Sequence, residues 1–135
     1  MKTDVTDFAE YLESFFFDYL GTEQGASKHT VRSYRDTFIL LIDYMSGVKG
    51  ISVDKLSMKS FSRDVMLSFL NWLQDNRNNS VSTRNQRYAA ICSFFEFMER
   101  KDPTSLATWQ SIRSIKSKKA PVPTVSYLTV DGIKC

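Results

Sequence analysis

The sequence predicts an all-α domain, and three observations support this prediction. Apolar residues recur at spacings of three and four through most of the chain, which is the pattern of amphipathic helices. The 135 residues are enough for one domain of ordinary size and too few for two. The composition, with 42% hydrophobic and 24% charged residues and only five Gly and three Pro, is typical of a globular protein.

Four long helices and a short fifth follow from the apolar stripes and from the residues that flank them. Gly21 and Gly47 are expected to end the first two helices, and Pro103 follows the fourth. Ser27 is a good N-cap for the second helix, Ser60 or Ser62 for the third, and the fourth begins near Ser80 to Thr83. The predicted helices cover about residues 5–20, 28–47, 62–77, 80–101 and 104–113.

The inward-facing residues follow from the same stripes. The connector at about 48–60 is expected to pack Ile51, Val53 and Leu56 against the helices, and Cys92 is expected to be a small core residue. The predicted core of the helices comprises Phe8, Leu12, Phe15, Phe16, Tyr19, Leu20, Val31, Tyr34, Phe38, Leu41, Ile42, Met45, Val65, Met66, Phe69, Leu70, Leu73, Tyr88, Ile91, Phe94, Phe95, Phe97, Met98, Leu106, Trp109 and Ile112.

The last part of the chain has a different composition. Residues 114–135 combine several lysines with Pro121-Val122-Pro123, a sequence typical of an extended basic linker. Tyr127 to Asp131 resembles the start of a further unit. The sequence therefore predicts a helical domain over 1–113, followed by a linker and the first residues of a second domain over 114–135.

Charge is distributed unevenly along the chain. The net charge is +3, but residues 1–24 contain six acidic residues and one basic residue, whereas residues 25–135 contain seventeen basic and nine acidic residues. This asymmetry favours one surface that faces a polyanion and another that faces away from it. A solvated surface with chance clustering of charge is the alternative.

Several functional classes have no support in the sequence. The N-terminus is acidic and lacks the features of a secretory signal, and no apolar run reaches the ~18–20 residues of a membrane span, so a cytoplasmic location is expected. Two cysteines and one histidine cannot supply a standard four-ligand zinc site, and no metal or cofactor is expected. No glycine-rich phosphate loop, nucleophile elbow or paired carboxylates are present, so this piece is not expected to be an enzyme by itself.

The remaining signal lies at the starts of two predicted helices. Residues 27–35 read SKHTVRSYR and residues 80–87 read SVSTRNQR. Helix N-termini attract phosphate through free N–H groups and the helix dipole. Hydroxyl groups can bind phosphate oxygens there, and Arg, Asn and Gln can reach base edges. The alternative is that both segments are ordinary capped and exposed turns. If both bind DNA, Arg32, Arg35, Arg84 and Arg87 should share one continuous face.

The order of these motifs resembles the tyrosine recombinase (phage integrase) family. The resemblance rests on Ser27-x-x-Thr30-x-x-x-Tyr34, on Ser82-Thr83-Arg84-Asn85 followed by Ile91 to Phe95, on Asp102-Pro103, and on the segment from Lys118 to Thr129. It covers about residues 5–131 and implies the N-terminal core-binding domain of that family, a four-helix SAM-like bundle, here with a short fifth helix and an extended basic C-terminal linker.

The resemblance implies that the domain clamps double-stranded DNA while a catalytic domain, expected to be missing here, performs integration or recombination through a tyrosyl intermediate. His29-x-x-Arg32 matches a catalytic spacing of the family by coincidence, and Tyr127 is not the nucleophile. The acidic first helix and an exposed Phe17 are candidates for contacts with other recombinase protomers, although burial of Phe17 is an equal alternative. The implied DNA-binding residues are Lys28, His29, Thr30, Arg32, Arg35, Ser82, Thr83, Arg84, Asn85, Arg87, Lys116, Lys118 and Lys119.

Two other functions stay open at this point. A helical protein–protein interaction module without nucleic-acid binding would scatter its basic residues over the surface. A small all-helical enzyme would need a polar pocket, for which the sequence offers no candidate. The isolated chain is expected to be a monomer that does not associate with membranes.

Overall fold

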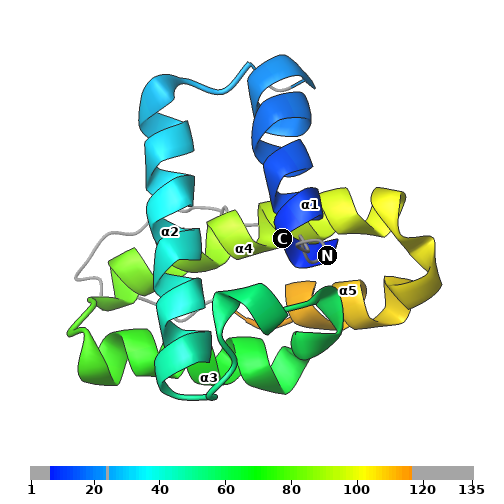
Figure 1. The fold of residues 1–135 in the computed structure, drawn as a ribbon. Coiled ribbons are helices and arrows are strands. Elements are labelled where there is room, and N and C mark those ends of the chain that lie inside the picture. Colours follow the sequence, from blue (N-terminus) through cyan, green and yellow to red (C-terminus); the bar gives the residue numbers. More distant parts are fainter. Residues whose placement is uncertain (1–6, 24, 117–135) are drawn as a thin grey trace.

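The computed structural model describes residues 7–23 and 25–116, and this part of the chain is helical without strands, as the sequence predicts. The α-helices are α1 (Asp7–Ser14), α2 (Lys28–Gly47), α3 (Arg63–Asn76), α4 (Val81–Lys101) and α5 (Leu106–Arg113). A π-helix, η1 (Phe15–Glu23), and three short 3-10 helices, η2 (Val53–Lys55), η3 (Met58–Ser60) and η4 (Pro103–Ser105), complete this part of the fold. The α1–η1 segment and α2 form an antiparallel pair that crosses α4, while α3 and α5 run alongside α4 (Figure 1).

Serine N-caps define where three of the helices begin. The side chains of Ser27, Ser62 and Ser80 each accept a hydrogen bond from the backbone N–H three residues later. Such bonds satisfy donors that a helix start otherwise leaves unpaired. The starts predicted for α2 and α4 are confirmed, and Ser62 rather than Ser60 caps α3.

The first helix differs from the prediction at its C-terminal end. Its α-helical part ends at Ser14, and the chain continues as the π-helix η1 through Gly21 to Glu23. The wider winding brings Phe15, Tyr19 and Leu20 into the core. The prediction that Gly21 stops the helix is therefore wrong. The helix continues past Gly21 because Phe15, Tyr19 and Leu20 pack into the core in the π-helical winding.

The core is built around α4, which is buried along most of its length. Phe94 lies within 6.1 Å, centroid to centroid, of both Phe8 and Phe38, so α4 packs against α1 and α2 through aromatic rings. Such edge-on pairs stabilise a core beyond the area that they bury. Cys92 is buried, as predicted. Thr37 and Tyr44 of α2 are also buried, although they are not on the predicted apolar stripe of this helix.

The α5 helix is held to α4 by two side chains that bond to backbone oxygens. The Tyr88 hydroxyl donates to the Ile112 carbonyl at 2.9 Å, and the Trp109 indole N–H donates to the Asp102 carbonyl at 3.1 Å. Burial raises the pKa of Tyr88 to about 12, so this hydroxyl keeps its proton and remains a donor at neutral pH. Leu106, which was predicted to face inward, is exposed.

Further predictions concern the connector and the C-terminal end. In the connector, Leu56 is buried as predicted, whereas Val53 is exposed, because η2 presents it to solvent. Ile115, two residues past the end of α5, is buried against the helices. The remainder of the predicted linker and the segment from Tyr127 to Asp131 lie outside the described residues.

Candidate nucleic-acid interface

The α2 and α4 helices begin with the same local structure. At each start, the serine hydroxyl donates to the hydroxyl of the threonine three residues later, and that threonine's N–H donates back to the serine oxygen. All four distances are 3.1 Å, for the Ser27–Thr30 and the Ser80–Thr83 pairs. Because each threonine hydroxyl accepts a bond from serine, its own hydrogen is available to donate outward.

These two starts can hold anions in the same way. The backbone N–H groups of the first helical residues, Lys28 and His29 in α2 and Val81 and Ser82 in α4, have no partner within the helix. The helix dipole places partial positive charge at the same point. A phosphate oxygen would therefore meet N–H donors, a threonine hydroxyl and a favourable field at either start.

The N-terminal half of α2 carries exposed basic side chains. Lys28, His29 and Arg32 are exposed, and Thr30 is partly buried by its cap. Arg35 is exposed too, but it lines an apolar groove between α1 and α2. The structure therefore places Arg35 at the rim of the groove between α1 and α2.

On α4, a polar stripe faces solvent beside the predicted residues. Ser82 and Gln86, which are four residues apart, are exposed, and Thr83 and Asn85 are partly buried. Gln86 was not among the predicted site residues, although the i, i+4 spacing from Ser82 places it on the same face. Ala89 and Ser93 continue this face with small, partly exposed side chains, which allow close approach of a partner.

Arg87 links the two helices. Its Nη1 donates to the Ser33 carbonyl at 3.3 Å and to the Thr37 hydroxyl oxygen at 3.2 Å, both on α2. Thr37 in turn donates to the same Ser33 carbonyl at 3.2 Å. Arg87 thereby fixes the point at which α2 crosses α4.

Arg84 lies inside the domain rather than on its surface. Only 2% of it is exposed, and its Nη2 donates to the Asn71 side-chain oxygen on α3 at 3.4 Å. Its Nε and Nη1 are buried without a hydrogen-bond partner among the described residues. Burial lowers the pKa of this guanidinium from its ordinary value. The expectation that Arg32, Arg35, Arg84 and Arg87 share one exposed face is therefore not met, because Arg84 and Arg87 point to neighbouring helices.

Replacing Arg84 by methionine is expected to leave the domain as stable or to stabilise it by about 1 kcal/mol or more. A buried charge with few partners costs desolvation free energy, and an apolar side chain of similar volume avoids that cost. Urea unfolding measures the change, and a loss of more than about 1 kcal/mol would contradict this account. The same variant also tests the predicted contact of Arg84 with DNA, because loss of that contact would weaken binding.

The predicted linker lysines are described only in part. Lys116 is exposed just after α5, whereas Lys118 and Lys119 lie outside the described residues. Their contact with DNA stays a prediction.

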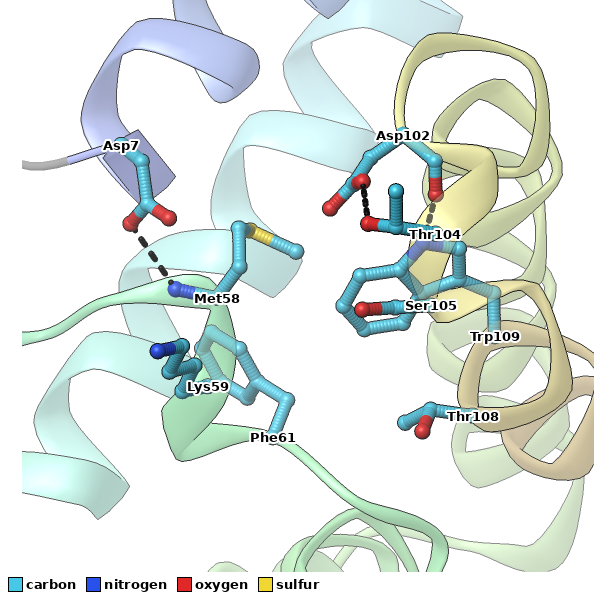
Figure 2. A pocket seen from close by; sticks show the side chains of 9 residues that line it. All are labelled: Asp7, Met58, Lys59, Phe61, Asp102, Thr104, Ser105, Thr108 and Trp109. Carbon is cyan, nitrogen blue, oxygen red and sulfur yellow. Dashed lines mark hydrogen bonds between the residues drawn. The ribbon is translucent and has the colours of Figure 1, made fainter.

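A polar pocket of about 310 Å³ lies between the start of α1, η3 and the turn from α4 into α5 (Figure 2). Its two carboxylates have structural partners. Asp7 accepts from the Met58 N–H at 3.0 Å, and Asp102 accepts from the Thr104 hydroxyl at 2.5 Å. Both carboxylates therefore hold backbone turns in place. Among the described residues, no cluster of three or more His, Cys, Asp or Glu side chains is suited to a metal ion.

The fold and the comparisons with known proteins identify the family. The helices form an all-α domain of the SAM-like type, and the sequence pattern of the family described as "Phage integrase, N-terminal SAM-like domain" matches residues 5–102. The chain belongs to this family. No solved structure gives a significant match to the chain. Within the described part of the chain, no helix is both long and apolar enough to cross a membrane.

The curated relatives carry recombinase names. The chain is 36% identical over 90% of its length to y4rD and 33% identical over 94% to y4rC, two proteins of Sinorhizobium fredii that carry integrase/recombinase names. It is 27% identical over 87% of its length to the tyrosine recombinase XerC of Herpetosiphon aurantiacus. The chain spans 43%, 38% and 37% of these three relatives, respectively.

Proposed function

We propose that this chain is a DNA-binding domain that positions a tyrosine recombinase on duplex DNA. The observation that carries the proposal is the pair of identical helix starts, Ser27–Thr30 and Ser80–Thr83, on two helices that Arg87 links directly. Each start offers donors to a phosphate, so the two helices together would contact the backbone at two fixed points.

Within this proposal, the exposed residues have separate roles. Lys28, His29 and Arg32 face outward on α2 and would contact phosphates, while Ser82, Asn85 and Gln86 on α4 would reach toward base edges in a groove. Thr30 and Thr83 would donate their hydroxyl hydrogens to phosphate oxygens. Lys116, with Lys118 and Lys119, would follow the backbone where the chain leaves the domain.

The whole protein's activity is also a proposal. The relatives are more than twice as long as this chain, and one of them is named a tyrosine recombinase. We infer that this domain acts beside a catalytic domain that cuts and rejoins DNA, together with other protomers of the same recombinase. The domain itself would supply affinity and orientation.

A salt titration of binding to a duplex tests the proposal. We expect the double variant Lys28→Ala/Arg32→Ala to bind about tenfold or more weakly near 50 mM salt. The slope of log affinity against log salt should become shallower by about 0.9 for each lost phosphate contact. Fluorescence anisotropy with a labelled duplex measures both quantities.

The matched control removes two charges elsewhere. The variant Lys49→Ala/Lys59→Ala has the same net charge as Lys28→Ala/Arg32→Ala. Both lysines are exposed, and both are distant in sequence from the two helix starts. Equal losses for the two double variants would indicate that binding depends on net charge alone. Absence of any binding near 50 mM salt would favour the protein-interaction module instead.

A further inference from the structure

Arg77 lies in the turn between α3 and α4, three residues before the serine that caps α4. Its side chain lies against two neighbours. The guanidinium carbon is 5.2 Å from the centre of the Trp72 ring, and Nη2 is 3.6 Å from a carboxylate oxygen of Asp43 on α2. The Trp72 ring packs in turn against the ring of Tyr44, at 5.2 Å between centres. Arg77 is therefore a cation placed close to the proposed phosphate site at the α4 start.

The ion pair between Arg77 and Asp43 is loose. The Arg113–Glu99 pair of the same domain provides a comparison, because its N–O distance is 2.6 Å and its side chains are only 22% and 16% exposed. For Arg77 and Asp43 the distance is 3.6 Å and the side chains are 44% and 58% exposed. A distance of 3.6 Å exceeds that of a charge-assisted hydrogen bond, and water screens a pair this exposed. Asp43 therefore offsets part of the charge of Arg77 without holding its side chain firmly.

Backbone hydrogen bonds hold this turn in place, so only the side chain of Arg77 needs to move. The N–H groups of Arg77 and Asn79 both donate to the Leu73 carbonyl, at 3.2 and 3.0 Å. Asn78 between them has a φ of 57°, in the left-handed region that asparagine adopts more readily than most residues. With ~3.8 Å between consecutive Cα atoms, the Cα atom of Arg77 lies within about 11 Å of that of Ser80. A phosphate at the α4 start would therefore be near the guanidinium.

We propose that Arg77 is a DNA-contacting residue that Asp43 restrains in the free domain. On binding, the guanidinium exchanges the Asp43 carboxylate for a phosphate oxygen near the α4 start. The phosphate can approach to hydrogen-bond distance, whereas the carboxylate lies at 3.6 Å. Asp43 is thus an intramolecular competitor that weakens binding. This inference rests on the proposed DNA binding, and neither residue is among those that the sequence predicts for it.

Asp43→Asn tests this inference, with binding to a labelled duplex measured by fluorescence anisotropy. We expect the variant to bind about two- to fivefold more tightly than the wild type near 100 mM salt, since an exposed ion pair contributes up to about this factor. Arg77→Ala should bind more weakly, and the slope of log affinity against log salt should become shallower by about 0.9. In the Arg77→Ala background, Asp43→Asn should have no further effect, because the restrained group is absent.

Glu96→Gln is the matched control. It also removes one negative charge from an exposed residue, but Glu96 is about 24 Å from the start of α4 at ~1.5 Å per residue. This distance exceeds the screening length of about 10 Å in 0.1 M salt, so the variant should bind like the wild type. Circular dichroism checks that each variant stays helical.

The outcomes separate this inference from the proposed function. Equal effects of Asp43→Asn and Glu96→Gln would overturn the inference and leave the domain a DNA-binding module. Tighter binding by Asp43→Asn in the absence of Arg77 would do the same, because Asp43 would then act through its charge alone. Absence of duplex binding by the wild type near 50 mM salt would overturn both.

Discussion

Replacing Phe15 by alanine is expected to lower the free energy of unfolding by about 3–5 kcal/mol, the largest effect that we predict for a single side chain. Phe15 is fully buried, and its ring lies at the junction of α1, α2 and α4. The cost combines lost burial with the cavity that the missing ring leaves, because the surrounding helices can close only part of it. Its ring contacts those of Phe16, Tyr19, Tyr34, Phe38, Phe94 and Phe97.

Phe17→Ala is the matched control for this prediction. It removes the same side chain two residues further along the same π-helix, but from an exposed position. We expect a change within about 0.5 kcal/mol. Urea unfolding compares the two variants. Similar losses at both positions would mean that η1 does not hold Phe15 in the core as described.

The helix starts could be predicted from sequence because their determinants are local. A serine N-cap and the threonine three residues later act within one turn, so Ser27 and Ser80 identify the starts of α2 and α4 without reference to the rest of the chain. The π-helix could not be predicted in this way. Its winding depends on how Phe15, Tyr19 and Leu20 fit against α2 and α4, and this fit is a property of the assembled core.

The two helix starts could be predicted, but which of their side chains are exposed was harder to predict. Arg84 illustrates the reason. The apolar stripe of α4 that contains Tyr88 and Ile91 extends back to position 84 by steps of four and seven residues, which indicates the core. An arginine at the start of a basic segment suggests an exposed position instead, and here the periodicity was the better guide. The same periodicity places Gln86 outside, where the structure has it.

Arg87→Ala is expected to destabilise the domain by about 1.5–3 kcal/mol, since hydrogen bonds to charged groups contribute about this much. The substitution removes both bonds to α2, to the Ser33 carbonyl and to the Thr37 hydroxyl. Thr37→Val removes only one of them and should cost less. In a double-mutant cycle the two substitutions should show a coupling of about 0.5 kcal/mol or more, because they share one bond.

The DNA-binding measurement separates this positioning role of Arg87 from direct contact with phosphate. If Arg87 only fixes the crossing of α2 and α4, Arg87→Ala weakens binding through misplaced helix starts, and no phosphate contact is removed at Arg87 itself. The salt dependence of binding should then stay close to that of the wild type under conditions where the variant is folded. A slope shallower by about 0.9, together with unchanged stability, would instead assign Arg87 to the phosphate backbone. Arg87→Lys refines the distinction, because lysine keeps the positive charge but lacks the guanidinium whose Nη1 donates to both Ser33 and Thr37. The Arg87→Lys variant should therefore be destabilised, as Arg87→Ala is.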